Sequence, residues 1–179
     1  MEMVLGKVNA EKLSYVFVIF LTGCVTGWVY EEIFYLITEG TLQNRGVLYG
    51  PWLPIYGIGA VFMYFMKGVK KNPFLLFLSC ACIAGIVEYS IGFAGIEYFG
   101  MRLWDYRNLF MNVDGIICLR SVVSFGLMGV IFHYLAEPAV EKIYLGLDRA
   151  KVNNILAAAA VIFAADIILS ILFRTPITY

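Results

Sequence analysis

The sequence contains little charge and a single histidine. Only 15% of its 179 residues are charged, against about 25% in ordinary soluble domains, and the formal net charge is zero. A neutral chain without a basic cluster lacks the electrostatic footprint of a nucleic-acid-binding protein. Neither of the common glycine-rich nucleotide-binding motifs is present. These absences argue against a nucleic-acid partner and against nucleotide hydrolysis by this chain.

Residues that commonly bind metals or perform nucleophilic catalysis are also scarce. Cys80 and Cys82 are separated by one residue instead of two, and His133 is the only imidazole. No nucleophile elbow or zinc-protease motif occurs, which disfavours a serine–histidine enzyme. We therefore expect no metal, cofactor or disulfide. The cysteines are interpreted as small buried hydrophobic residues, and His133 as a residue of the membrane interface.

Apolar residues make up 61% of the chain, and its mean hydropathy is +0.82. This composition is that of an integral membrane protein. The length allows about five crossings of roughly 20 residues each, so we predict one all-α transmembrane domain over residues 1–179. The predicted apolar runs are Leu13–Tyr30, Leu53–Met66, Pro73–Tyr98, Ile116–Ala136 and Ile155–Phe173.

Two segments do not fit a plain membrane helix. The stretch Asn44–Gly59 carries two prolines and four glycines among apolar residues, which predicts an irregular or re-entrant segment. Such backbone is tolerated in lipid only where it packs against protein or lines a cavity, so the stretch is either a tight turn or the wall of a site. Glu137–Asn153 alternates apolar and charged residues at helical spacing, which predicts an amphipathic helix on the inner membrane surface or, alternatively, a coupling helix that docks on a cytoplasmic partner.

Basic residues predict the orientation of the chain in the cytoplasmic membrane. With five crossings and the N-terminus inside, all seven lysines and Arg149 would face the cytoplasm, and the other five arginines would face outward. The positive-inside rule therefore favours an inside N-terminus and an outside C-terminus. The apolar run that follows the start has no cleavage pattern, so we expect this first helix to remain in the mature protein.

Acidic residues within the apolar runs are the main candidates for function. Glu88 shares a helix face with Gly85, Gly92 and Gly95, where a second helix can approach. A charge there is costly in lipid and needs a partner, so Glu88 is either a functional acid or one member of a packing contact. Glu31 and Glu32 reach the same predicted outer level, where they could equally be ordinary interfacial carboxylates. Asp166 should point inward, toward a hydroxyl, a backbone group or an arginine such as Arg120.

Several short motifs are spread over roughly Gly27–Gly126. They are Gly27-Trp28, Glu31, Asn44-Arg45-Gly46, Gly50-Pro51, Pro54-Ile55-Tyr56-Gly57, Glu88, Trp104-Asp105-Tyr106, Asn112 and Ile117-Cys118-Leu119-Arg120. As a set, these motifs resemble the bacterial family of putative ABC-transporter permeases, the CmpB-like or "type IV" group. The resemblance implies a small multipass permease, and it implies a separate ATPase subunit because this chain has no ATPase motif.

The leading hypothesis is a transporter for a small solute or cation, with an outward-facing polar pocket. Acidic residues outnumber arginines in the predicted outer layer, which suits a cation or amine better than a phosphate. One alternative is an intramembrane enzyme acting on a lipid or isoprenoid head group, with Glu88 or Asp105 as the acid or base. Another is an accessory or structural membrane subunit. The predicted pocket residues are Glu31, Glu32, Asn44, Arg45, Tyr56, Glu88, Trp104, Asp105, Asn112 and Arg120.

Overall fold

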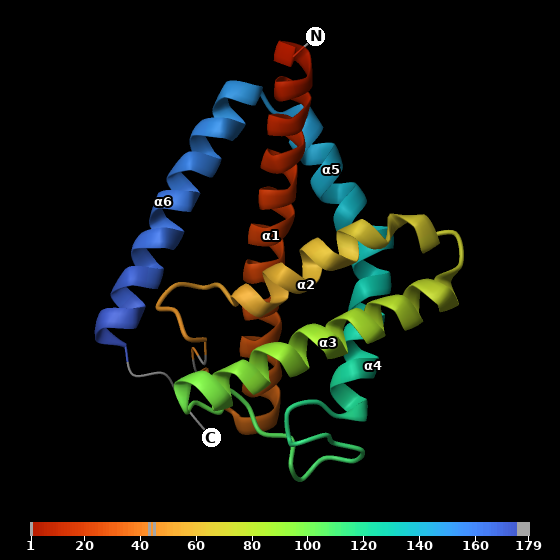
Figure 1. The fold of residues 1–179 in the computed structure, drawn as a ribbon, viewed down its shortest axis with the longest axis vertical. Coiled ribbons are helices and arrows are strands. Elements are labelled where there is room, and N and C mark those ends of the chain that lie inside the picture. Colours follow the sequence, from red (N-terminus) through yellow and green to blue (C-terminus); the bar gives the residue numbers. More distant parts are fainter. Residues whose placement is uncertain (1, 43, 45, 175–179) are drawn as a thin grey trace. The chain divides into compact units, whose positions relative to one another are not determined.

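The computed structural model describes residues 2–42, 44 and 46–174, with side chains from residue 11 onward. Throughout this part of the chain the regular elements are helices, and there is no strand, as predicted. Figure 1 shows them in sequence colours. The elements are α1 (Glu2–Glu39), α2 (Pro54–Tyr64), the 3-10 helix η1 (Phe65–Val69), α3 (Pro73–Phe99), α4 (Leu119–Ile131), the π-helical turn η2 (Phe132–Ala136), α5 (Glu137–Gly146) and α6 (Arg149–Phe173).

Among the described residues, four helical stretches are long and apolar enough to cross a membrane. They are Glu11–Glu39, Pro73–Phe99, Leu119–Gly146 and Arg149–Phe173. The shorter apolar stretch Pro54–Val69 corresponds to the second predicted run. The prediction of a helical membrane protein is therefore confirmed.

The segment predicted as a surface helix, 137–153, is divided between two elements. Its first part, α5, continues directly from α4 through η2, and its last part begins α6. Pro138 would ordinarily interrupt such a helix, because its ring clashes with the carbonyl four residues earlier. That carbonyl belongs to Tyr134, inside η2, and we attribute the continuity to the wider hydrogen-bond spacing of a π turn. The real break comes at Asp148, whose side chain accepts a hydrogen bond from the Lys151 amide at 3.0 Å and caps α6.

The described chain divides into two compact units. Unit 1 combines the residues up to Gly57 with those from Pro138 onward, and unit 2 is Ile58–Glu137. In unit 1, α1 contacts α6. Phe20 of α1 and Phe163 of α6 meet edge to face, with ring centroids 5.6 Å apart, which is a favourable geometry for an aromatic pair.

In unit 2, α3 packs on α4 through small residues. Gly85, Gly92 and Gly95 of α3 are buried, as the predicted small-residue face requires. On α4, a Cβ added at Gly126 would lie 2.7 Å from Cε2 of Phe77, and one at Gly129 would overlap Cys80. Without a side chain at these positions the helix backbones approach closely, which is how helices commonly associate in lipid.

His133 was predicted as a residue of the membrane interface, and the structure places its ring inside unit 2. Its side chain is fully buried, because the π turn directs the ring toward the end of α2 and toward Glu137. The cysteines largely behave as expected. All four thiols are free, and three of them are buried, whereas Cys82 lies on the exposed side of α3.

Candidate functional site

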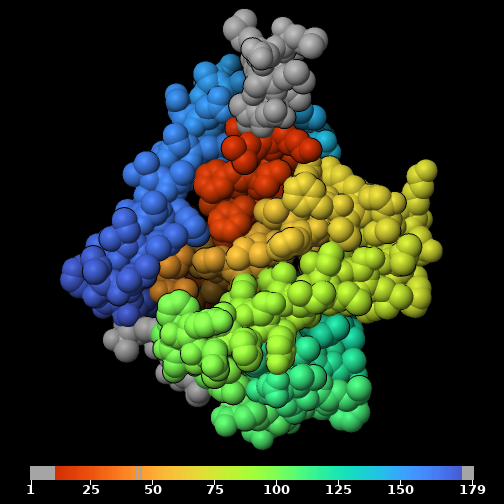
Figure 2. Space-filling view, viewed as in Figure 1, coloured from red at the N-terminus to blue at the C-terminus, as the bar shows by residue number. Residues whose placement is uncertain are grey.

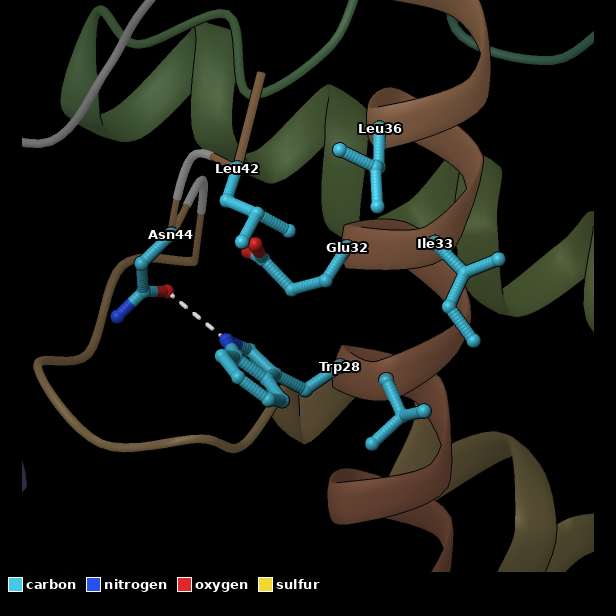
Figure 3. A pocket seen from close by; sticks show the side chains of 7 residues that line it. Trp28, Glu32, Ile33, Leu36, Leu42 and Asn44 are labelled. Carbon is cyan, nitrogen blue, oxygen red and sulfur yellow. Dashed lines mark hydrogen bonds between the residues drawn. The ribbon is translucent and has the colours of Figure 1, made fainter. Parts of the chain in front are cut away.

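A pocket of about 420 Å³ opens in unit 1 beside the C-terminal half of α1 (Figure 3). Helix α1 ends at Glu39 because Gly40 takes the left-handed conformation, with φ of +71°, and turns the chain back. The irregular segment that follows this turn supplies Leu42 and Asn44 as the facing wall. We call this cavity the Glu32 pocket. It is lined by Trp28, Val29, Glu32, Ile33, Leu36, Leu42 and Asn44.

Glu32 is the one ionisable residue among those lining residues, and it is 8% exposed. Figure 3 shows its carboxylate pointing across the pocket toward Leu42, near the Trp28 indole. Trp28 precedes Glu32 by four residues, so both side chains leave α1 on the same face. The pocket therefore presents one acidic group within otherwise apolar and aromatic walls.

Asn44 connects the two walls of the Glu32 pocket. Its side-chain oxygen accepts a hydrogen bond from the Trp28 indole at 3.2 Å, drawn as a dashed line in Figure 3. Its amide donates to the carbonyls of Leu48 and Tyr49, at 3.4 and 2.8 Å. This side chain orients the indole and also closes the turn that follows it.

Asp166 holds the irregular segment that follows Asn44. Its carboxylate accepts hydrogen bonds from the amides of Tyr49 and Gly50, at 3.0 and 2.8 Å, and from the Trp52 indole at 2.5 Å. The Ser170 hydroxyl donates to it at 3.0 Å. Figure 2 shows this segment, in orange, against the blue C-terminal part of α6. Asp166 thus points to a hydroxyl and to backbone amides, two of the partners predicted for it.

Arg174 is a second anchor, and sequence reasoning did not identify it. Its guanidinium donates to the carbonyl of Leu48 and, at 2.7 Å, to that of Asn44. It also lies over the Tyr49 ring, 5.2 Å from the centroid. Nothing local in the sequence indicates this role, because Arg174 is simply the first residue after the last apolar run.

Two further predicted residues in unit 1 lie close together. The Tyr56 hydroxyl donates to Glu31 at 2.5 Å. A side chain at Gly27 would overlap the Tyr56 ring, so the glycine lets α2 begin against α1. Arg45, another predicted pocket residue, lies outside the described residues.

The remaining predicted residues lie in unit 2, and Glu88 is the most buried of them. It is 3% exposed and accepts a hydrogen bond from the Tyr106 hydroxyl at 3.1 Å. The Trp104 indole donates to the carbonyl of Ile116 at 2.7 Å. The first contact joins α3 to the connection that leads into α4, and the second lies within that connection, whose Trp104 and Ile116 side chains pack against Gly92 of α3. The connection therefore covers the face that carries Glu88.

Asp105 is engaged by the arginine that follows it two residues later. Three side-chain hydrogen bonds, 2.6–3.0 Å long, join the Arg107 guanidinium to the Asp105 carboxylate. These bonds lower the pKa of Asp105 to about 2. Asn112 donates to the carbonyls of Arg107 and Leu109 and accepts from the Gly115 amide, which gives the turn its shape. Arg120 is exposed at the start of α4.

The predicted pocket residues therefore form two sets. Glu32 and Asn44 line one pocket in unit 1, with the Glu31–Tyr56 pair in the same unit. Glu88, Trp104, Asp105, Asn112 and Arg120 belong to unit 2. The convergence of the two sets in one site stays a prediction.

Comparison with known proteins gives one match. A family model described as Putative ABC-transporter type IV matches residues 18–171. The matched range includes every predicted pocket residue as well as Asp166. No curated protein and no solved structure matches the chain.

Proposed function

Because the chain belongs to the Putative ABC-transporter type IV family, we propose that it is a membrane transport protein that binds a small organic cation in the Glu32 pocket. The single observation that carries this proposal is the isolated, largely buried carboxylate of Glu32 among apolar walls. A carboxylate in such surroundings is stabilised by an opposite charge, because burial without a partner is costly.

The lining chemistry favours an amine with an apolar body. In the part of the chain that the structure describes, no basic side chain lines the pocket, so an anion would meet only the repulsion of Glu32. The Trp28 indole offers an aromatic face on which a cation is attracted by the ring quadrupole. The surrounding aliphatic side chains suit the rest of such a ligand. The volume falls within the range of about 300–1,000 Å³ that is usual for small-molecule sites.

The two anchors support a pocket that is shaped before the ligand arrives. Arg174 and Asp166 hold the segment around Asn44 and Tyr49, and Asn44 holds Trp28. A preformed site loses less conformational entropy on binding than one that must be ordered by its ligand. In this proposal Asn44, the first residue of the irregular segment, is part of the wall of the site.

The remaining features of the proposal come from the sequence and the family. We place the protein in the cytoplasmic membrane as one transmembrane domain, with the N-terminus inside and the Glu32 pocket near the outer surface. Energy for transport would come from a separate ATPase subunit, since this chain carries no nucleotide-binding motif.

Binding to the purified full-length protein in nanodiscs tests the proposal. Phenethylamine is the cationic probe, and 2-phenylethanol is the neutral probe of nearly the same shape. We expect calorimetry to detect the amine and not the alcohol. Glu32→Gln should weaken amine binding at least about tenfold, which corresponds to about 1.4 kcal/mol. Glu39→Gln, at the exposed end of the same helix, is the matched control and should leave binding unchanged.

Uptake of the labelled amine into proteoliposomes then separates transport from binding alone. Glu32-dependent uptake supports the transporter. Glu32-dependent binding without uptake, even with the energy-coupling partner present, identifies an accessory subunit with a ligand site. Equal affinity for the amine and the alcohol, or binding that is indifferent to Glu32→Gln, contradicts the proposed cation site.

A further inference from the structure

Both ring nitrogens of His133 face oxygen atoms inside unit 2. Nδ1 lies 2.9 Å from Oε2 of Glu137, and Nε2 lies 2.7 Å from the carbonyl oxygen of Met63. The imidazole is fully buried, and Glu137 is only 2% exposed. Met63 is near the C-terminal end of α2, just before the helix passes into η1. Both contacts have the lengths of strong hydrogen bonds.

Counting protons shows what these two contacts require. A neutral imidazole carries one N–H, so it can donate to only one of the two oxygens. The carbonyl of Met63 can only accept. A carboxylate is also acceptor-only when it is ionised. With a neutral ring and an ionised Glu137, one nitrogen lone pair would therefore lie against an oxygen lone pair at less than 3 Å. The geometry needs one proton more than that state contains.

The lysines of η1 and the following turn indicate where this additional proton resides. Nζ of Lys67 is 2.6 Å from Oε1 of Glu137, and Nζ of Lys70 is 3.7 Å from Oε2. Two ammonium groups stabilise the ionised carboxylate, so the proton belongs on the imidazole.

We propose that His133 and Glu137 form a proton-binding site within the membrane-spanning helices, whose occupied state is an imidazolium–carboxylate pair. The bound proton joins the end of α2 to the α4–α5 helix, because His133 can donate to Met63 and to Glu137 only when both of its nitrogens are protonated. Removal of the proton leaves one acceptor facing another, and that contact between the helices is lost. The π turn at η2, a feature often found at functional sites, is what presents the ring to α2.

The surroundings contain few other groups that titrate. Tyr134 donates its hydroxyl to the carbonyl of Lys70, at 2.5 Å, and so fixes the turn that carries the lysines. From α3, the thiol of Cys80 belongs to the adjacent apolar cluster with Met63 and Leu76. Lys67 and Lys70 are partly exposed, with 42% and 34% of their side-chain area accessible. The two lysine side chains therefore extend from the buried Glu137 carboxylate to the surface.

The test uses the fact that this chain has one histidine. Protein labelled with 15N in histidine, reconstituted in lipid, gives signals from one imidazole, and their chemical shifts report the proton on each nitrogen. We expect two protonated nitrogens at about pH 8, where a solvated imidazole is neutral. A neutral ring at that pH, in either tautomer, overturns the proposal.

Substitutions at the carboxylate provide a second measurement. Glu137→Gln replaces the anion with an amide that can donate to Nδ1, so the ring no longer needs its second proton. We expect this variant to show a neutral imidazole with the proton on Nε2 at about pH 8. Glu141→Gln, one turn along α5 and exposed, is the matched control and should retain the imidazolium. An imidazolium that persists in Glu137→Gln contradicts the assigned pair.

Discussion

Asp166 shows how one side chain can organise backbone that forms no regular structure. Its two oxygens accept from four donors, and two of these are amides of the segment that precedes α2. Without Asp166 those amides would need another acceptor, which lipid does not supply. Gly50 is required for the same contact, because a Cβ there would lie 2.9 Å from Oδ2 of Asp166 and would overlap the Trp52 indole.

Asp166→Asn should therefore destabilise unit 1. Both carboxylate oxygens accept from donors, so the NH2 group of asparagine would face a hydrogen-bond donor at either position. Hydrogen bonds to a charged acceptor contribute about 1.5–3 kcal/mol. We expect a lower thermal unfolding midpoint and faster proteolysis at 46–53 in detergent. Asp148→Asn makes the same chemical change at the N-cap of α6, where asparagine caps as well as aspartate, so it should be nearly neutral. Equal stability of the two variants would contradict the anchoring role.

At the scale of the helices, the α3–α4 pair is the best-defined packing contact of unit 2. Lipid supplies no hydrophobic drive for helix association, so close van der Waals contact has to hold the pair together. Gly126 and Gly129 provide this contact by leaving room for Phe77 and Cys80. Cys118 caps the start of α4. Its side chain accepts a hydrogen bond from the Ser121 amide, and the Ser121 hydroxyl accepts one from the Cys118 amide.

Gly129→Ala should loosen this contact between the helices. The added methyl would overlap the Cβ of Cys80, and overpacking typically costs about 1–3 kcal/mol. Gly59→Ala is the matched control, because nothing lies within 4 Å of a Cβ at that position of α2. Alanine propensity predicts that this control gains about 0.5–1 kcal/mol. In detergent, the thermal unfolding midpoint of Gly129→Ala should fall and that of Gly59→Ala should rise. A higher midpoint for Gly129→Ala would refute the packing argument.

For the whole molecule, the number of crossings depends on α2 and η1. The 11 residues of α2 and the 5 of η1 extend about 26 Å together, against about 30 Å of hydrocarbon. Lys67 lies within η1 and Lys70 directly follows it, and both side chains can reach the remaining distance to water. A stretch of this length crosses the bilayer with slight local thinning, so five crossings are expected.

Reporter fusions test this topology. We expect a periplasm-active phosphatase to be active when fused after residue 179 and inactive when fused after Gly146, because five crossings put these positions on opposite sides. If Pro54–Val69 entered and left on the same side, the C-terminus would lie inside and the fusion at residue 179 would be inactive. That result would also place Lys67 and Lys70 on the outside, against the positive-inside rule.

Two of the seven residues that line the Glu32 pocket were accessible to sequence reasoning. Glu32 and Asn44 were predicted as pocket residues because a carboxylate at the end of an apolar run and a broken segment after it are local signals. The burial of Glu88 followed from its position among glycines at helical spacing. His133 and Glu137 lie four residues apart on one helix. Side chains at this spacing are neighbours on a helix surface, so the sequence carried a usable signal for this pair.

The sequence by itself determined the class of this protein and the approximate positions of its membrane helices. In lipid the backbone must satisfy its own hydrogen bonds, so a long apolar run has few alternatives to a helix, and local composition is sufficient to predict it. Only the tertiary structure decided which residues form the pocket and its anchors. Asp166 meets the Tyr49 amide across 117 residues of sequence, and His133 meets Met63 across 70. Contacts between such distant residues depend on how the chain folds back on itself, and local composition carries no record of that path.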